Sequence, residues 1–279
     1  MSSVLNHLSI PIRSDKYSLN VQVTRTLASV KSEFQQIDIV DSDCFGRMLL
    51  LDGHIQFTRI DEHAYHEALV HIPAMSIANL TRALVVGGGD GGVIRELCRH
   101  KSIEQIDVVE IDQAVIDACK EHLPEISNGA FDDPRVHLHV TDAFPFVKKA
   151  DAGIYDLIVL DSTDTYEDEE GEISEMLFTQ EFYHDCKRLL APGGLVVTQA
   201  DNLLFCPYSL DEIEAQFSKV FPKTGSFWSI VPSFGSFSGF FWASVDAEIA
   251  SEFDASKAPA GLKYLNPNTW KLGTSPLPF

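Results

Sequence analysis

The stretch Val85-Val86-Gly87-Gly88-Gly89-Asp90-Gly91-Gly92 follows a short apolar run and precedes a segment with helical spacing. Glycine lacks a Cβ, so it lets the backbone turn tightly and approach a bound ligand closely. A glycine-rich turn between a strand and a helix is typical of sheets that bind nucleosides at the carboxyl ends of their strands. The motif alone is a weak signal, so the segments around it must indicate the same architecture.

Strands alternate with helices over the part of the chain that contains this loop. The apolar patterns predict strands over residues 83–86, 106–109, 136–140, 155–160, 195–198 and 240–245, and helices over residues 93–99, 114–122 and 182–190. Such alternation forms βαβ crossovers and a mainly parallel sheet covered on both faces. The predicted fold class is therefore α/β, with a Rossmann-like, methyltransferase-type doubly wound sheet.

The beginning of the chain has a different pattern. Residues 17–58 contain short alternating or β-branched runs, separated by turns such as Leu51-Asp52-Gly53-His54. We predict a small N-terminal antiparallel β domain over residues 1–60 and a Rossmann-like catalytic domain over residues 61–279. A helical pattern over residues 61–72 opens the second domain.

Composition narrows the class of ligand. The chain has 21 Lys and Arg residues against 41 Asp and Glu residues, a net charge of −20. A negative field repels nucleic acid and attracts small cations, although an acidic surface also serves solubility alone. No stretch approaches the roughly 20 apolar residues of a membrane span, and the N-terminus lacks a signal-peptide core. We expect neither nucleic acid nor a membrane as partner.

Cysteine usage indicates the compartment. The five cysteines are odd in number, scattered and without a Cys-x-x-Cys pair; they are Cys44, Cys98, Cys119, Cys186 and Cys206. This pattern argues against a disulfide framework and against a zinc ribbon. We therefore expect reduced thiols in a cytoplasmic protein.

Three acidic residues lie at the ends of successive predicted strands. Asp90 lies in the glycine loop, Glu110 ends the next strand 23 positions after Gly87, and Asp142 follows the third strand and precedes Ala143. Ligands of open α/β sheets bind along this edge. Glu110 is placed to accept hydrogen bonds from both ribose hydroxyls, and Asp142 from an adenine amino group.

Asp90 separates two kinds of donor. In ordinary methyltransferases this loop borders the methionine carboxylate of S-adenosylmethionine, and a second carboxylate there would be repelled. A donor that lacks the carboxylate keeps an ammonium and a sulfonium, both of which Asp90 attracts. The residue therefore favours decarboxylated S-adenosylmethionine over the intact molecule.

Several motifs, in order along almost the whole chain, resemble those of the spermidine synthase (polyamine aminopropyltransferase) family. The segments that match family motifs are Ser32-Glu33-Phe34-Gln35, Leu51-Asp52-Gly53-His54-Ile55-Gln56, Asp61-Glu62-His63-Ala64-Tyr65-His66-Glu67, Gly87-Gly88-Gly89-Asp90-Gly91-Gly92, Val109-Glu110-Ile111-Asp112 and Leu160-Asp161-Ser162-Thr163-Asp164. An ordered set of this kind is far more specific than any one member.

The resemblance implies a role for each matching residue. The donor's thioadenosine part would be contacted by Gln35, Gly87, Glu110, Asp142 and Ala143. The aminopropyl and polyamine region would be contacted by His66, Asp90, Asp161, Asp164 and Gln199. Asp161 matches the catalytic carboxylate, Asp164 the residue that holds the acceptor amine, and Tyr65 a cleft residue that assists Asp161. The family usually forms dimers or tetramers, so a homodimer or homotetramer is implied.

The chemistry of these residues agrees with that activity. Alkyl amines are protonated near neutral pH and cannot attack in that form. Asp161 could orient the amine and accept its proton, while the sulfonium leaves. No cofactor is implied, because the donor is a co-substrate. His66 and His71 are five positions apart rather than four, so we predict no metal site on that helix.

Three departures from the family pattern bear on the acceptor, and one of them is Ala143, which follows Asp142 where many relatives have glycine. Many relatives have Pro-Thr-Tyr where this chain has Pro232-Ser233-Phe234, and an acidic run from Glu167 to Glu172 follows Asp164. We expect putrescine as the acceptor, with spermidine, agmatine and cadaverine as alternatives. The alternative functions are a small-molecule methyltransferase on the same scaffold and an inactive nucleoside- or polyamine-binding protein.

Overall fold

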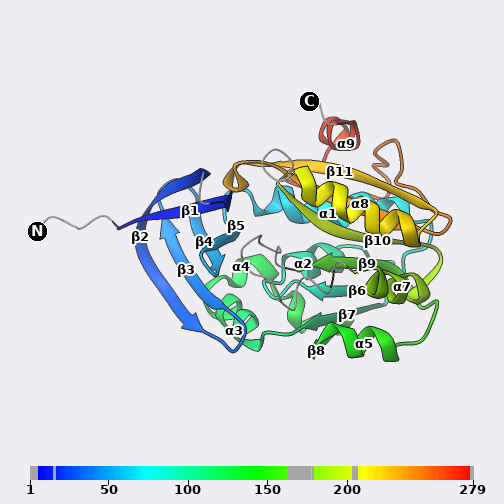
Figure 1. Ribbon diagram of the computed structural model, residues 1–279, viewed down its shortest axis with the longest axis horizontal. Coiled ribbons are helices and arrows are strands. Elements are labelled where there is room, and N and C mark those ends of the chain that lie inside the picture. Colours follow the sequence, from blue (N-terminus) through cyan, green and yellow to red (C-terminus); the bar gives the residue numbers. More distant parts are fainter. Residues whose placement is uncertain (1–5, 15–16, 163–176, 178, 203–206, 277–279) are drawn as a thin grey trace, which may run out of the picture.

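The computed structural model of the chain describes residues 6–14, 17–162, 177, 179–202 and 207–276. Two sheets organise it, and Figure 1 shows the smaller one, near the N-terminus, beside the larger one. The acidic run and Asp164 lie outside the described residues.

The smaller sheet is an antiparallel meander of five strands. Its order is β1 (Asn6–Ser14), β2 (Tyr17–Lys31), β3 (Gln36–Ser42), β4 (Gly46–Leu51) and β5 (His54–Thr58). The turn from β4 to β5 requires left-handed backbone at Asp52, with φ 47°, and at Gly53, with φ 84°. The predicted antiparallel sheet is confirmed, and β1 is a strand that the sequence pattern did not indicate.

The larger sheet has seven strands in the order β11-β12-β10-β9-β6-β7-β8. The strands are β6 (Arg82–Gly87), β7 (Gln105–Glu110), β8 (Val136–Val140), β9 (Tyr155–Asp161), β10 (Leu190–Asn202), β11 (Lys223–Val231) and β12 (Ser236–Ser244). Strands β8, β7, β6, β9 and β10 are parallel neighbours, whereas β12 is antiparallel to both β10 and β11. The order of the parallel strands reverses between β6 and β9, since β7 and β8 lie on one side and β10 on the other. Folds of this kind bind ligands at the carboxyl ends of the strands at such a reversal.

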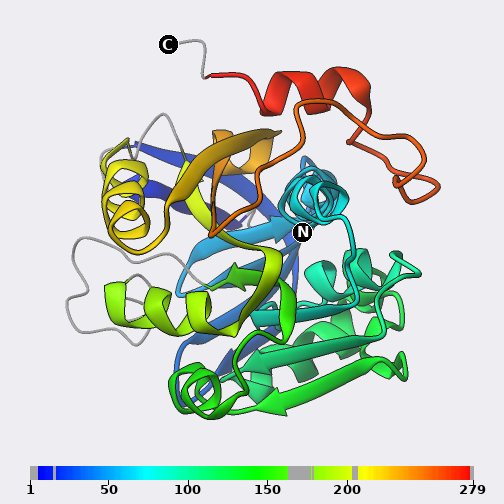
Figure 2. The same cartoon turned by 90° about the vertical axis from the view of Figure 1, so that its right-hand side faces the viewer.

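Helices cover both faces of this sheet, as the alternation predicted (Figure 2). The described α-helices are α1 (Glu62–Ser76), α2 (Gly92–Cys98), α3 (Gln113–His122), α4 (Pro124–Ser127), α5 (Ala143–Lys149), α7 (Gln180–Leu189), α8 (Pro207–Val220) and α9 (Pro267–Gly273). Helices α1 and α2 pack on the face that carries Val85 and Val108, and α5, α7 and α8 on the face that carries Val86 and Ile158. The predicted α/β, doubly wound architecture is confirmed.

A hydrophobic core joins the small sheet to helix α3. Ile37, Ile39 and Leu49 of the small sheet pack against Val115 and Cys119 of α3. The small sheet is thus attached to the helix that follows β7. The division of the chain at residue 60 remains a prediction.

Helix α1 differs from the expected one in length and in burial. It continues past residue 72, through Pro73, to Ser76. Proline removes one backbone hydrogen bond, but burial of almost the whole helix offsets that cost. Since both faces are buried, polar residues such as Glu62 and Glu67 lie inside the protein, which the helical pattern alone did not indicate.

Some elements had no clear sequence signal. Helix α5 contains Pro145. Strand β10 begins at Leu190 and continues through Pro192 and both glycines that follow, before the strand predicted from residue 195. Tertiary packing overrides the local propensity of these segments. Within the described residues no helix is both long and apolar enough to cross a membrane.

Candidate active site

The glycine loop is joined to the end of β9. A Cβ at Gly87 would lie 2.1 Å from the carbonyl oxygen of Asp161, and the amide of Gly88 donates to that same oxygen at 3.1 Å. Gly87 also has φ 85°, which a side chain disfavours. Only glycine therefore lets the loop lie directly against the backbone of the proposed catalytic residue.

Asp90 projects from this loop into a buried cluster. Its Oδ1 accepts the amide hydrogen of Gly92 at 2.5 Å, and its Oδ2 lies 3.6 Å from His66 Nε2. A Cβ at Gly92 would lie 2.3 Å from Cε1 of His66, so the start of α2 packs on the imidazole ring. Gly92 thus makes room for His66, whereas Gly91 leaves room for Ser127 and Phe131.

Tyr65 and Asp161 complete the cluster from α1 and β9. The hydroxyl of Tyr65 donates to Asp161 Oδ1 at 2.7 Å. Four residues predicted to act on the aminopropyl group and the amine therefore meet in space: Tyr65, His66, Asp90 and Asp161. They come from a helix, a loop and a strand that are distant in sequence.

Burial and charge set the protonation states of the cluster. Burial raises the pKa of Asp161, and the nearby Asp90 charge raises it further, to about 6, against the opposing effects of His66 and the Tyr65 hydroxyl. Burial alone would lower the pKa of His66, but Asp90 and Glu62 raise it to about 10. Burial alone would raise the pKa of Asp90, but His66 and the Gly92 amide lower it below its usual value. Asp161 is thus a base with a pKa close to neutrality, beside an Asp90 whose pKa is lowered.

Glu110 lies at the end of β7, next to the glycine loop. Its side chain is 8% exposed, and Oε1 accepts the amide hydrogen of Asp112 at 2.9 Å. A Cβ at Gly89 would lie 2.9 Å from Glu110 Oε2, so that glycine leaves room for the carboxylate. Burial raises the pKa of Glu110 to about 7, with the charge of Asp112 adding to the shift against backbone amides that lower it.

Gln35 reaches the same edge through Asp112. Gln35 Nε2 donates to Asp112 Oδ2 at 3.0 Å, and Ser32 Oγ donates to the same oxygen at 2.7 Å. Asp112 also caps α3 by accepting from the amide of Ala114. The role of Asp112 as the link between the two sheets was missed from the sequence, although an Asp directly before a helix is a capping signal.

Asp142 and Ala143 lie just beyond the end of β8. The carboxylate of Asp142 accepts from the amide of Phe144 at 2.8 Å and caps α5, while Ala143 is buried. Cap and strand end hold these two residues on the sheet edge that also carries Glu110. Their proposed contact with adenine stays a prediction.

The remaining predicted residues line the end of β10 and the segment between β11 and β12. Gln199 Nε2 donates to the carbonyl oxygen of Ser162 at 3.2 Å, next to Asp161. The ring of Phe234 packs edge-on against Tyr65, with centroids 5.8 Å apart. Asp61 anchors this segment by accepting from the amide of Ser233 at 2.8 Å. Asp164 lies outside the described residues.

Possible ligand atoms of His66, Asp90 and Asp161 lie within 4.8 Å of one another. That spacing would accept a metal ion as well as an organic ammonium. The cluster lies beside the glycine loop and Glu110, and a glycine loop with a neighbouring carboxylate is typical of a nucleoside site rather than of a metal site. We assign the cluster to an organic cation, and the absence of a metal remains a prediction.

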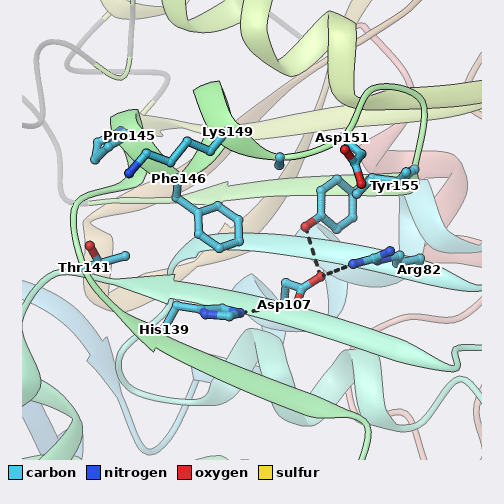
Figure 3. Close-up of a pocket in the computed structure, with 11 residues that line it drawn as sticks. Arg82, Asp107, His139, Thr141, Pro145, Phe146, Lys149, Asp151 and Tyr155 are labelled. Carbon is cyan, nitrogen blue, oxygen red and sulfur yellow. Dashed lines mark hydrogen bonds and ion pairs between the residues drawn. The ribbon is translucent and has the colours of Figure 1, made fainter.

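A separate cavity of about 470 Å³ lies under α5 (Figure 3). The carboxylate of Asp107 at its centre accepts from Arg82 at 3.1 Å and from Tyr155 at 3.0 Å, and His139 Nε2 lies 3.3 Å away. Gln105 donates to both of its oxygens. Asp107 is saturated by these partners, so we assign it to holding β6, β7, β8 and β9 together.

Fold and site together define a class of protein. It is an α/β protein with a glycine loop suited to a nucleoside, and beside the loop the cluster of Tyr65, His66, Asp90 and Asp161 is suited to a cation. Residues 62–252 match the family model described as "Spermine/spermidine synthase domain". Residues 11–59 match the family model described as "Spermidine synthase tetramerisation domain".

Similar proteins agree with these matches. The chain is 40% identical over 218 residues to spermidine synthase 1 of Hyoscyamus niger, covering 78% of this chain and 67% of the relative. It is 38% identical over 258 residues to spermidine synthase 1 of Pisum sativum, covering 88% and 75%. A crystal structure of a spermidine synthase with the transition-state analogue AdoDATO superposes with a TM-score of 0.89 at 29% identity, covering 96% of this chain and 91% of that one. The spermidine synthase of Thermotoga maritima gives a TM-score of 0.89 at 28% identity, covering 99% and 92%.

The chain belongs to the spermine/spermidine synthase family, whose members are transferases.

Proposed function

We propose that this enzyme transfers the aminopropyl group of decarboxylated S-adenosylmethionine to putrescine and releases 5′-methylthioadenosine. The observation that carries the proposal is the joining of Asp161, Tyr65 and Asp90 directly beside the glycine loop. Carboxylates at this point face a donor and an acceptor that are both positively charged. The family membership of the chain supports the same reaction.

Each step of the reaction has a residue suited to it. Glu110 and Asp142 hold the nucleoside part of the donor, together with Gln35, Gly87 and Ala143. Asp161 accepts a proton from the acceptor ammonium, and Tyr65 orients that carboxylate. The free amine then attacks the aminopropyl carbon next to sulfur. A carbon–nitrogen bond forms, the carbon–sulfur bond breaks, and its electron pair stays on sulfur as the neutral thioether. No cofactor takes part.

Asp90 selects the donor by charge. Its pKa is lowered and its side chain is largely buried beside the glycine loop, where we place the aminopropyl end of the donor. A second carboxylate there would be repelled in a site of low dielectric, while the ammonium of the decarboxylated donor is attracted. His66 and Gln199 add polar contacts on the amine side.

The choice of putrescine rests on the family resemblance and on the acidic lining. Asp164 would hold the far ammonium of the diamine. Phe234 offers a ring where many relatives have a tyrosine, so one polar contact to the acceptor is lost. A longer amine such as spermidine, or agmatine or cadaverine, is the alternative.

The decisive experiment supplies purified enzyme with each donor in turn. Decarboxylated S-adenosylmethionine with putrescine should yield 5′-methylthioadenosine and a product heavier by one aminopropyl group, measured by mass spectrometry. Formation of a methylated product from intact S-adenosylmethionine would instead identify a methyltransferase. Binding of 5′-methylthioadenosine without turnover on any of the four amines would indicate an inactive binding protein.

We further propose a homodimer or homotetramer in the cytoplasm. The match of residues 11–59 to a tetramerisation domain supports an oligomer, and the scattered cysteines of the sequence support the compartment. Light scattering coupled to gel filtration distinguishes dimer, tetramer and monomer, and a monomer would reject the first part. Fractionation of cells that express the tagged protein tests the second.

A further inference from the structure

A chain of charged side chains leads from the active-site histidine into the protein interior. His66 Nδ1 lies 2.7 Å from Glu62 Oε2, one helical turn earlier in α1. Arg95 of α2 contacts both oxygens of Glu62, with NH1 to Oε1 at 3.2 Å and NH2 to Oε2 at 2.8 Å. Neither Glu62 nor Arg95 contacts Asp90 or Asp161 among the interactions of the described residues.

We propose that Glu62 and Arg95 are positioning residues, which fix the imidazole of His66 so that Nε2 faces Asp90 and keeps that carboxylate directed at the donor's ammonium. This inference rests on the proposed function of the site. It adds two residues that the comparison of motifs did not single out for a role in the reaction.

The geometry around Arg95 leaves the guanidinium little freedom. Besides the two contacts to Glu62, its Nε donates to Glu96 at 2.7 Å and its NH1 donates to the carbonyl oxygen of Ile126 at 2.7 Å. A planar guanidinium held on two sides orients a carboxylate far better than a single point charge does. Arg95 therefore holds Glu62 in one orientation.

The imidazole ring is held equally closely. Gly92 packs on one face, and Tyr65 packs edge-on with ring centroids 5.3 Å apart. A half-turn of the ring would exchange Nδ1 for a carbon and lose the contact with Glu62. The hydrogen bond to Glu62 thus selects the ring orientation that presents Nε2 to Asp90.

Burial makes this arrangement costly to disturb. Glu62 is 4% exposed and His66 1% exposed. Removing one member of a buried charged set leaves the others unpaired, which is strongly unfavourable. The groups that face His66 are Glu62 from α1, Asp90 from the glycine loop and Asp161 from β9, with Arg95 of α2 behind Glu62.

The series of His66, Glu62 and Arg95 fixes the positions of charged groups and does not conduct protons. Arg95 interrupts it, and a guanidinium does not give up its proton in proteins. The proton that Asp161 receives must therefore leave by another route. Glu62 and Arg95 therefore have a positioning role and not a catalytic one. Their replacement should affect binding of the donor more than the chemical step.

The test compares Glu62→Gln with Glu67→Gln as a matched control. Glu67 is also buried in α1, next to His66 in sequence, but its carboxylate accepts backbone amides of Lys263, Tyr264 and Leu265 instead. We expect Glu62→Gln to raise KM for the decarboxylated donor about 10- to 100-fold, with a smaller change in kcat and an unchanged Kd for 5′-methylthioadenosine, which lacks the ammonium. Glu67→Gln should lower the melting temperature without changing KM.

The pH profile of activity provides a second test, because a purely structural role of Glu62 would leave that profile unchanged. Asp90 and Glu62 together raise the pKa of His66 to about 10, so without Glu62 this pKa is lower and the imidazolium is lost at lower pH than in the wild type. The decline of activity on the alkaline side should therefore begin at lower pH in Glu62→Gln than in the wild type and in Glu67→Gln. Arg95→Lys, which keeps the charge but loses the two-point contact, should change KM in the same direction by a smaller factor.

A folded Glu62→Gln enzyme with wild-type KM and pH profile would overturn the proposal. If Glu62→Gln does not fold, ¹⁵N NMR of the wild-type protein decides, with the His66 signals assigned by comparison with His66→Gln. An imidazolium that persists above pH 9 supports the proposal, and titration near pH 6.5 overturns it. The NMR result needs no turnover, so its failure is distinct from a failure to release 5′-methylthioadenosine.

Discussion

Tyr65 donates its phenolic hydrogen to Asp161 at 2.7 Å, although the two residues are 96 positions apart in the chain. The contact joins the first helix of the larger domain to the carboxyl end of the central strand β9. It directs one carboxylate oxygen toward the tyrosine and leaves the second, Oδ2, on the side of the glycine loop near Gly88.

Replacing Asp161 with Asn removes the proton acceptor while keeping the shape of the side chain. Turnover should fall by about 100- to 10,000-fold, the usual range for loss of a general base. The affinity for 5′-methylthioadenosine, measured by calorimetry, should change little, since the nucleoside contacts lie at Glu110 and Asp142. A near-normal kcat would remove Asp161 from its proposed role.

The acid side of the pH profile should report the ionisation of Asp161. Burial and the charge of Asp90 raise its pKa to about 6, so kcat/KM should fall as pH drops through that value. The Tyr65 hydroxyl opposes the shift, and Tyr65→Phe should therefore move the acid limb to higher pH. Initial rates between pH 5 and 8 at low amine concentration measure both. An acid limb that stays in place in Tyr65→Phe would contradict the link.

Glu110→Gln should stabilise the ligand-free protein and weaken its binding of the nucleoside. The folded-state pKa of Glu110 is about 7 against an ordinary 4.5, so its favourable protonated form is lost as pH rises through 7. At pH 8 the buried carboxylate costs stability, and Gln should stabilise the ligand-free protein by about 1–3 kcal/mol. At pH 5 the two proteins should melt alike, because Glu110 is then neutral.

The same substitution should weaken binding of 5′-methylthioadenosine at pH 8 by about 10- to 100-fold, because a charged acceptor of hydrogen bonds is lost. Thermal unfolding at pH 5 and pH 8, with calorimetric binding at pH 8, checks both halves of the expectation. An identical difference in melting temperature at the two pH values would show that ionisation of Glu110 is not the cause.

Phe234→Tyr should restore a hydroxyl on the wall next to Tyr65. One added hydrogen bond to an acceptor amine corresponds to about 0.5–1.5 kcal/mol, so KM for putrescine should fall about 2- to 10-fold. Phe237→Tyr is the matched control. Phe237 lies in β12, and its ring packs against Trp228 of the paired strand β11. Equal changes in both variants would mean that position 234 does not face the acceptor.

Removal of metal ions should leave the reaction unchanged. The ligand atoms of His66, Asp90 and Asp161 lie close enough for an ion, but we assign them to the organic cations of the reaction. Dialysis against EDTA, followed by assay with decarboxylated donor and putrescine, checks this. Loss of activity that zinc or magnesium restores would reverse the assignment.

Much of the site could be predicted from the sequence because its signals are local. The glycine loop, the acid at the end of β7 and the Asp before α5 are short patterns whose spacing is set by a strand, a turn and a helix start. Such patterns identify the edge of the sheet and the kind of ligand.

The role of Glu62 could be predicted only in part from the sequence. It lies within the motif from Asp61 to Glu67, and its spacing of four from His66 is visible in the sequence. Its pairing with Arg95 is not visible, because α1 and α2 meet only in the folded protein. Asp112 was missed for the same reason, since Gln35 reaches it from the other sheet.

The sequence by itself determined the alternation of strands and helices, the glycines that the loop requires and the acidic character of the site, because each depends on neighbouring residues and on steric limits of the backbone. Only the tertiary structure decided which acids are buried, which carboxylate is raised toward neutrality and which residue orients His66. Those properties depend on desolvation and on distances between segments far apart in the chain, and neither exists before the chain folds.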